Sequence, residues 1–248
     1  MQELVYILPV HQEEKVLAKN VATLVEHLSR LPSSVFRSPE ILLVANGCKD
    51  ASADVARSLE TEGPIRIRAY EEREAGIGVA YHRGLVELLA SDRPPTRTWA
   101  VLTAADLPFG FSDVNAAMIE LERGRSRIIV GSKAHPESHA PTGVTRKAMS
   151  LAYRVARRAV VGMRVGDSQG SLFLRLDLAA ELVPRVRSRN FFYSTEVCHY
   201  AEQLGEEIVE VPVRVEQSAR ERPSTVRPVR DGLAMARQLV ELRRRRSA

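Results

Sequence analysis

The segment WAVLTAADLP, residues 99–108, joins a strand pattern to a polar break. Its apolar run, Trp99 to Leu102, ends abruptly in small residues and one acid, Asp106. Two other apolar runs, residues 4–8 and 41–44, also end in polar residues, and a helical pattern follows each of them. This alternation predicts an α/β fold, in which a mainly parallel sheet is flanked by helices. Because right-handed crossovers bring strand C-termini to one edge, a binding cleft is predicted there.

Weaker patterns extend the alternation along the chain. Further strands are predicted over residues 65–70, 127–130 and 207–215. Helices are predicted over residues 16–28, 79–89, 113–122, 146–161 and 191–204, from residue 52, and from residue 229 towards the C-terminus. Because no repeat and no clear linker interrupts this order, residues 1–248 are predicted to form a single domain.

The composition is that of a globular protein. Hydrophobic residues make up 44% of the 248, which is enough for a sizeable core. No apolar run approaches the roughly 20 residues that span a bilayer, and the first residues do not form a signal peptide pattern. Cys48 and Cys198 lie far apart, without metal-ligand spacing. These features predict a soluble, cytoplasmic protein without a zinc site or disulfide framework.

The positive charge is concentrated at the C-terminal end. From Arg214 onward the chain has ten Arg and four acidic residues, a balance of +6, whereas the whole chain carries +5. The run Arg243 to Arg246 closes this segment. One interpretation is a solvated tail, and the other is attraction to an anionic surface such as membrane headgroups. Aromatic residues make up 5% and do not alternate with the basic ones, so binding to nucleic acid is not predicted.

Four polar turns carry recognisable motifs. They read PVHQE (residues 9–13), ANGCKD (residues 45–50), AGIGVA (residues 75–80) and AAD (residues 104–106). In this order they resemble the inverting glycosyltransferases of family 2, which have the GT-A fold. Within that family the motifs resemble most the subgroup that glycosylates polyprenyl phosphates. The resemblance covers nearly the whole chain, from Ile7 to about Leu239.

The resemblance implies that these turns form the donor site. In the family, the first two turns hold the nucleotide base and the ribose, whose hydroxyls need carboxylate or amide acceptors. The matching residues here are Pro9, His11 and Glu13 in the first turn, Asn46 and Asp50 in the second, and Gly76 in the third. Ala45 replaces a family carboxylate, so the resemblance leaves a UDP and a GDP type of donor open.

The fourth turn implies a weakened metal site. The family has Asp-x-Asp here, and its carboxylates hold a divalent cation on the donor diphosphate. In this chain Ala104 stands in place of the first acid and is followed by Ala105 and Asp106, which are both predicted to line the donor site. Asp106 is therefore the predicted metal ligand and a predicted catalytic residue, with diphosphate oxygens completing the shell of Mg²⁺ or Mn²⁺. The alternative is that basic side chains stabilise the leaving diphosphate.

The second half implies an acceptor site. Lys133 in GSK (residues 131–133), Arg146 and Ser150 match family residues that bind the acceptor phosphate. On a helix, Arg146 and Ser150 are four residues apart and face the same side. Arginine binds phosphate through two parallel hydrogen bonds, and lysine supplies a point charge. The alternative interpretation is a solvated basic helix face.

Three further motifs match parts of the family site. Asp167 in DSQGSLF (residues 167–173) matches the loop near the transferred sugar, and Glu196 matches an acid at the start of a helix. Both are predicted catalytic residues, although a carboxylate in a first helical turn is also favoured by the helix dipole. Arg222 and Ser224 match the loop that closes over the donor diphosphate.

The predicted function is inverting transfer of a sugar from a nucleoside diphosphate to a polyprenyl phosphate. The resemblance divides the chain into a nucleotide-sugar-binding half (residues 1–130), an acceptor half (residues 131–228) and a basic tail (residues 229–248) that contacts the inner face of the membrane. Two alternatives remain: a soluble hydroxyl acceptor, and a nucleotide-sugar binding protein without catalysis. A nucleotidyltransferase is disfavoured because the first turn lacks a glycine-rich loop with Arg or Lys.

Overall fold

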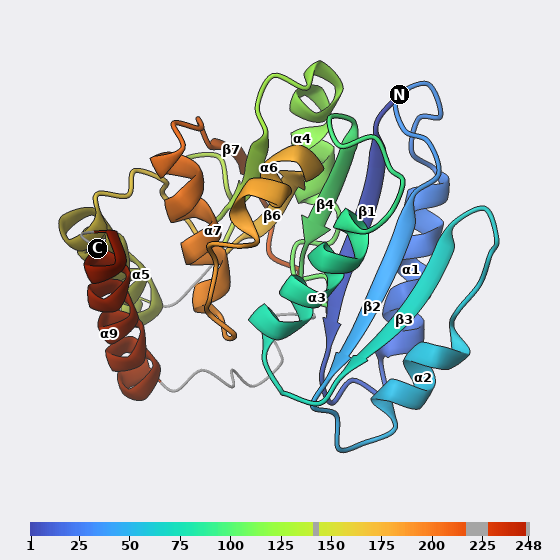
Figure 1. Ribbon diagram of the computed structural model, residues 1–248, viewed down its shortest axis with the longest axis horizontal. Coiled ribbons are helices and arrows are strands. Elements are labelled where there is room, and N and C mark those ends of the chain that lie inside the picture. Colours follow the sequence, from blue (N-terminus) through green and yellow to red (C-terminus); the bar gives the residue numbers. More distant parts are fainter. Residues whose placement is uncertain (141–143, 217–227, 247–248) are drawn as a thin grey trace.

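The computed structural model describes residues 1–140, 144–216 and 228–246, and within these the side chains of residues 144–146, 228–233 and 246 are left out. Seven strands form one sheet (Figure 1): β1 (Glu3–Val10), β2 (Glu40–Asn46), β3 (Arg66–Glu72), β4 (Thr98–Leu102), β5 (Ile128–Ser132), β6 (Ser171–Arg175) and β7 (Val209–Pro212). The helices are α1 (Leu17–Ser29), α2 (Ser52–Ser58), α3 (Ile77–Leu89), α4 (Ser112–Arg123), α5 (Val144–Val161), α6 (Leu176–Leu182), α7 (Phe192–Gln203) and α9 (Pro228–Arg246).

The strands lie in the order β3-β2-β1-β4-β6-β5-β7. β1 pairs in parallel with β2 and β4, and β3 continues the parallel run beyond β2. β6 runs antiparallel to both of its neighbours, β4 and β5, while β7 pairs in parallel with β5. The predicted α/β fold with one mainly parallel sheet is therefore confirmed.

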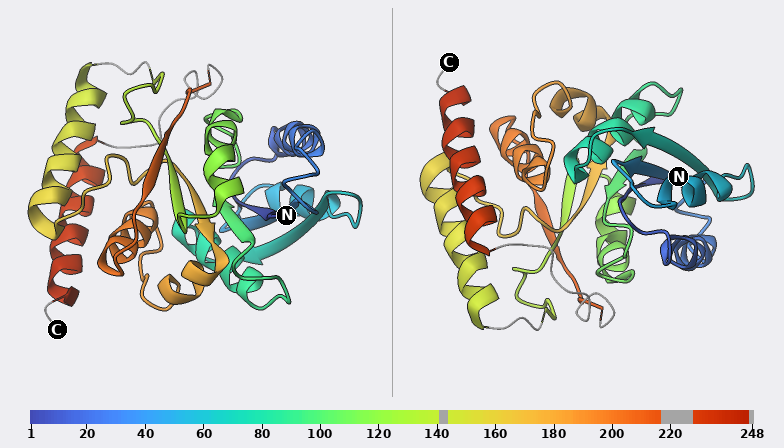
Figure 2. Two further views of the ribbon diagram at one scale, coloured as in Figure 1. Left: turned by 90° about the horizontal axis from the view of Figure 1, so that it is seen from above. Right: turned by 90° about the horizontal axis from the view of Figure 1, so that it is seen from below.

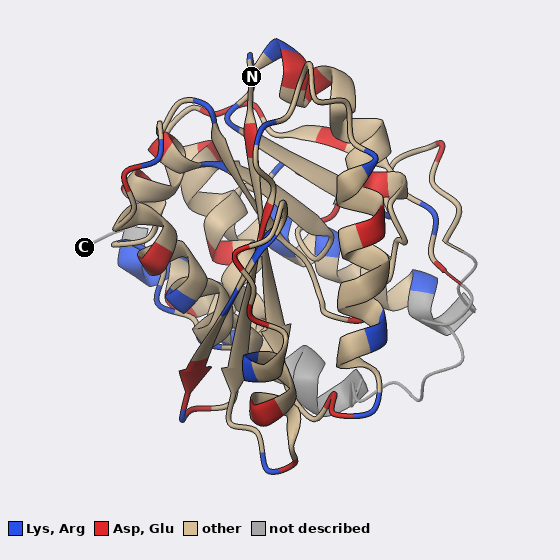
Figure 3. Cartoon of the chain, turned by 90° about the vertical axis from the view of Figure 1, so that its right-hand side faces the viewer, with Lys and Arg blue, Asp and Glu red and all other residues tan. Residues whose placement is uncertain are grey.

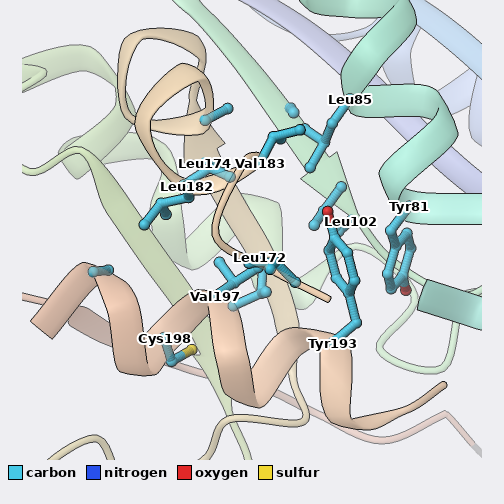
Figure 4. Packing of buried hydrophobic residues seen from close by; sticks show 14 of the residues in the cluster. Tyr81, Leu85, Leu102, Leu172, Leu174, Leu182, Val183, Tyr193, Val197 and Cys198 are labelled. Atoms are coloured by element: carbon cyan, nitrogen blue, oxygen red, sulfur yellow. The ribbon is translucent and has the colours of Figure 1, made fainter. Parts of the chain in front are cut away.

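Two apolar layers cover the faces of the sheet, because successive side chains of a strand point to opposite faces. Leu4, Tyr6 and Leu8 of β1 pack on the side of α1, α2 and α4. Val5 and Ile7 pack on the other side, with α3, α6, α7 and α9. Figure 4 shows part of this second layer, in which Tyr81 and Tyr193 have ring centroids 6.2 Å apart.

The observed elements differ from the predicted ones in two places. Helix α6 was not predicted, since its seven residues follow β6 directly and give too short a periodic pattern. The predicted strand over residues 207–215 is shortened to β7, which ends at Pro212. Proline has no N–H to donate to a strand ladder, and the pairing with β5 stops there. Beyond it, Arg214 forms an isolated parallel bridge with His139.

Helices α5 and α9 lie side by side at the end of the molecule remote from β3 (Figures 1 and 2). α9 joins them to the core through Leu239 and Leu242, which are buried. Seen from the β3 side, acidic and basic residues are interspersed over the surface (Figure 3). None of the helices in the described parts of the chain is long and apolar enough to cross a membrane.

Candidate active site

The predicted donor and acceptor turns meet at one edge of the sheet. β1, β2, β4 and β5 are parallel, so the residues that follow them share this edge. Because β6 is antiparallel, its preceding loop, residues 166–170, comes to the same edge. The order of the strands thus gathers segments that are far apart in the sequence.

Asn46 connects three of the predicted donor turns. Its side-chain amide donates to the carbonyl oxygens of Val10, at 3.0 Å, and Val44, at 3.2 Å. Its Oδ1 accepts the backbone N–H of Gly76 at 2.9 Å, and its carbonyl oxygen lies 2.8 Å from Nδ1 of His11. Asn46 is 2% exposed, so this predicted ribose-binding amide is already engaged in holding the turns together.

Hydrogen bonds also hold the turns after β1 and β2 to each other and within themselves. The hydroxyl of Ser52 accepts the backbone N–H of Glu13 at 2.7 Å. Asp50 accepts the N–H of Ser52 at 3.1 Å, and hydrogen bonding by Ser52 holds the pKa of the Asp50 carboxyl below its usual value. Gly47 has a φ of +56°, and a β-carbon there would lie 2.6 Å from that of Ala75. The turn therefore requires glycine at this position.

Asp106 lies at the end of β4, as predicted, in a tight turn. The N–H of Leu107 donates to the carbonyl of Ala104 at 3.0 Å, and Asn20 Nδ2 donates to the carbonyl of Ala105 at 3.0 Å. Burial raises the pKa of Tyr81 well above its ordinary value, and the nearby charge of Asp106 raises it further. Among the described residues, no three His, Cys, Asp or Glu side chains are grouped to hold a metal ion. A divalent cation at Asp106 would therefore need oxygens from the donor itself.

Lys133 and Asp167 form an ion pair. Lys133 Nζ lies 2.9 Å from Asp167 Oδ2 and donates to the carbonyl oxygen of Gln169 at 3.1 Å. Asp167 also accepts the backbone N–H groups of Lys133, at 3.0 Å, and Gln169, at 2.8 Å. Burial opposes ionisation of Asp167, but the charge and hydrogen bonds of Lys133 outweigh it and hold the pKa of the carboxyl below its usual value. The predicted acceptor lysine and the predicted catalytic acid thus form one unit.

Glu196 is buried, with 1% of its side chain exposed. Its Oε2 accepts the backbone N–H groups of Arg187, at 2.7 Å, and Ser188, at 2.9 Å, while Oε1 lies 2.8 Å from Arg245 Nη1 of α9. The segment that it holds, residues 187–190, packs against the start of α3: the carbonyl of Arg189 accepts the N–H of Val79 at 3.3 Å. It also closes over Gly76, where a β-carbon would collide with that carbonyl oxygen. In this structure the contacts of Glu196 are with the loop and with α9.

The remaining predicted residues are less well defined. Pro9 lies in β1, one residue before the first turn. Ser150 is exposed on α5, and Arg146 lies in the first turn of the same helix, but its side chain is outside the described part. Arg222 and Ser224 lie outside the described residues.

A hydroxyl network that the sequence did not reveal lies beside Asp167. Thr195 Oγ1 is 3.0 Å from the hydroxyl of Tyr153, 2.9 Å from that of Ser168 and 2.9 Å from Nε2 of Gln169. Arg157, one turn after Tyr153, donates to the carbonyl of Gly166 at 3.1 Å. The signal available in the sequence was the pair Tyr153 and Arg157, two polar residues four positions apart. The helix that contains them was predicted only as amphipathic, so the network was not expected.

No protein-family profile matches the chain. Among curated proteins, the chain is 26% identical over 241 residues to glycosyltransferase AglD of Haloferax volcanii, which covers 96% of this chain. The chain spans only 36% of the length of that relative.

Several solved structures share the fold. Glucosyl-3-phosphoglycerate synthase from Mycobacterium tuberculosis, in complex with uridine diphosphate, has a TM-score of 0.61 at 17% identity, over 98% of this chain and 79% of that one. TarS of S. aureus (residues 1–349) has a TM-score of 0.55 at 9% identity, over 98% and 65%. A 4-diphosphocytidyl-2C-methyl-D-erythritol synthase has a TM-score of 0.51 at 11% identity, over 96% and 100%.

The likeness concerns both the sequence and the fold. The comparisons confirm the resemblance to family 2-like glycosyltransferases of the GT-A fold. The structural likenesses at these identities establish the fold, whereas donor and acceptor depend on the site itself.

Proposed function

We propose that the chain transfers a sugar from a nucleoside diphosphate sugar to a polyprenyl phosphate, with inversion at the anomeric carbon. The observation that carries the proposal is the junction at Asn46, which draws the turns after β1 and β2 and the start of α3 together. Asp106 lies close enough to Tyr81 of α3 for its charge to raise the pKa of that residue. Such a ring of turns at the carboxyl edge of a parallel sheet suits a nucleotide. The mycobacterial neighbour was solved in complex with uridine diphosphate, which supports a donor of the same kind.

Asp106 is proposed to contact the donor diphosphate. Mg²⁺ in proteins commonly takes one or two carboxylates together with phosphate oxygens and water, so one carboxylate fits a cation that arrives with the donor. When bound, Mg²⁺ or Mn²⁺ offsets the charge that builds on the leaving diphosphate. Asp106 would hold this assembly at the end of β4.

The acceptor phosphate is proposed to bind beside the Lys133–Asp167 pair, with Arg146 and Ser150 of α5. One of its oxygens attacks the anomeric carbon as the bond from that carbon to the diphosphate oxygen breaks, and the nucleoside diphosphate leaves. A phosphate acceptor is already ionised, so the step needs no general base. Asp167 then serves to orient the Lys133 ammonium, whose distance from Asp167 Oδ2 is 2.9 Å.

A hydroxyl acceptor is the second candidate, in which Asp167, beside Lys133, would accept the proton of the attacking alcohol. The lowered pKa of Asp167 makes this carboxylate a weak base, which favours the ionised phosphate acceptor over an alcohol. The third candidate is a nucleotide-sugar binding protein without catalysis, motivated by Ala45 and Ala104, where the family has carboxylates.

The basic tail supports a cytoplasmic protein in peripheral contact with the membrane, close to a lipid-linked acceptor.

Thermal stability with UDP, GDP and dTDP, each with and without Mn²⁺, tests the donor site. We expect one nucleotide to raise the Tm, and to raise it further with Mn²⁺. The Asp106→Asn variant should keep the rise in Tm that the nucleotide alone causes and lose only the further rise with Mn²⁺. Asp54→Asn, on the exposed side of α2, serves as the matched control.

Absence of any shift with all three nucleotides would contradict the donor proposal. The acceptor is tested next, by mixing the labelled nucleotide sugar that fits the preferred base with a short polyprenyl phosphate or with the free alcohol. Transfer to the alcohol alone would favour the second candidate, and binding without transfer to either would favour the third.

A further inference from the structure

The side chain of Gln169 has both of its amide protons bound within the protein. Its Nε2 donates to the carbonyl oxygen of Phe191 at 3.1 Å and to Oγ1 of Thr195 at 2.9 Å. Because a backbone carbonyl only accepts hydrogen bonds, the nitrogen and not the oxygen of the amide must face Phe191. The Oε1 of this partly exposed side chain is therefore the atom that Gln169 offers to a ligand.

A buried hydroxyl network holds this amide in place. Thr195 is 0% exposed, and its Oγ1 lies 3.0 Å from the hydroxyl of Tyr153 and 2.9 Å from that of Ser168. A hydroxyl donates one hydrogen bond and accepts two. With Gln169 as one donor, Tyr153 and Ser168 take up the remaining capacity of Thr195. Rotation of Gln169 would leave a buried hydroxyl with one bond fewer, so the amide is preorganised.

Gln169 lies at the sheet edge among the acceptor residues and close to Asp106. Its backbone carbonyl accepts a hydrogen bond from the ammonium of Lys133 at 3.1 Å. β6 is antiparallel to β4 and pairs with it through Leu172 and Leu102. Gln169 comes before this pair in the chain and Asp106 comes after it, so both lie at the same end of two neighbouring strands.

The other partner of Gln169 belongs to the donor side. Phe191 directly follows residues 187–190, the segment that closes over Gly76 at the start of α3. During transfer, the sugar lies between the diphosphate that it leaves and the acceptor that it joins. A fixed oxygen between Lys133 and this donor-side segment is therefore placed to contact the sugar.

We propose that Gln169 selects the transferred sugar: its Oε1 accepts a hydrogen bond from one sugar hydroxyl, and Thr195 is the residue that positions it. The inference rests on the proposed binding of a nucleotide sugar. An ionised acceptor phosphate has no proton to donate to a carbonyl oxygen, whereas a sugar hydroxyl has one. A site built to bind a hydroxyl discriminates against a sugar that lacks it, because the oxygen of the protein is then left unpaired.

Calorimetry without an acceptor tests the contact. The parent chain is titrated with UDP-glucose, UDP-N-acetylglucosamine and GDP-mannose, and with UDP and GDP, and the nucleotide sugar that binds most tightly is kept. In Gln169→Met, which has a side chain of similar size without an amide, the Kd of this nucleotide sugar should rise about tenfold, while the Kd of its nucleoside diphosphate stays constant. Gln203→Met, at the far end of α7, where Nε2 lies 2.9 Å from His199 Nε2, is the matched control and should bind both ligands like the parent.

Monodeoxy forms of the same nucleotide sugar identify the hydroxyl. The parent chain should bind one of them about tenfold more weakly than the complete sugar, and Gln169→Met should bind that one as the parent does. Thr195→Val should show the same loss for the complete sugar and the same indifference to that deoxy form. A merely structural role of Thr195 would weaken binding of the nucleoside diphosphate as well.

Three results would overturn the sugar contact alone. They are equal affinity of the parent and Gln169→Met for the nucleotide sugar, an equal loss for nucleotide sugar and nucleoside diphosphate, or a parent affinity that no single deoxygenation changes. The last result uses only the parent chain, so a folding defect in a variant cannot obscure it. Absence of binding of every nucleotide by the parent would instead overturn the proposed function, and this inference with it.

Discussion

Replacing Glu196 by alanine should destabilise the protein and loosen the donor site. The substitution leaves the N–H groups of Arg187 and Ser188 without their acceptor in a partly buried place, so the lower end of the cost of an unsatisfied donor applies. Each unsatisfied buried donor costs about 1–3 kcal/mol, whereas losing the contact with Arg245, 34% exposed, costs at most about 1 kcal/mol. We therefore expect a loss of about 3 kcal/mol, which lowers the Tm of a chain of this size by about 6–12 °C.

Urea denaturation and nucleotide titration measure the two effects. Because residues 187–190 close over Gly76, the variant should bind the nucleotide less tightly. Glu196→Gln keeps one oxygen for the two N–H groups and should restore most of the stability, and Arg245→Gln should change it little. A variant Glu196→Ala as stable as the parent would refute the role in holding the loop. Normal stability and donor binding in Glu196→Gln, combined with loss of turnover, would instead identify a catalytic acid.

Three more substitutions test other parts of the structure. Asp106→Asn should lower kcat by about 100-fold or more, measured at saturating donor, without changing the Tm. Glu40→Gln, at the opposite edge of the sheet, leaves Arg93 and Arg68 beside a neutral amide. This variant should lower the free energy of unfolding, measured in urea, by about 3 kcal/mol, and its affinity for the nucleotide should not change. Lys133→Met should raise the pH at which the protein unfolds in acid. The lowered pKa of Asp167 stabilises the folded protein above the ordinary carboxyl pKa, and this stabilisation is lost as the pH falls through the pKa of Asp167 in the folded state. Without Lys133 there is less of this stabilisation to lose, so unfolding begins at a higher pH. An unchanged acid midpoint would argue against the ion pair.

The sheet edge could be predicted because its signals are local. An apolar run such as residues 41–44 followed by a polar turn identifies a strand and its end within ten residues. The parallel arrangement then follows from the alternation with helices. Asp106 needs no further information to be placed at the end of β4, where the structure has it.

The partners of the charged residues could not be predicted in this way. Glu196 and Arg245 are 49 positions apart, and Lys133 and Asp167 are 34 positions apart, so no periodicity relates them. The backbone N–H groups of a loop, which hold Glu196, leave no trace in residue types at all. Similarly, α5 carries apolar residues on two faces, and the residue pattern does not decide that Val161 packs in the core while Leu151 and Val155 are exposed.

The antiparallel strand β6 has a consequence for how the chain assembles during synthesis. The strands β1 to β4 all lie within the first 102 residues and pair with one another, so this part of the sheet can form early. β5 lies beside β6 and β7, both later in the chain. Until residue 175 has left the ribosome, β4 has an open edge and β5 has no neighbour in the sheet. That interval, of about 4–15 seconds at ordinary rates of translation for the residues after β4, is when a nascent chain is most exposed to wrong strand pairing.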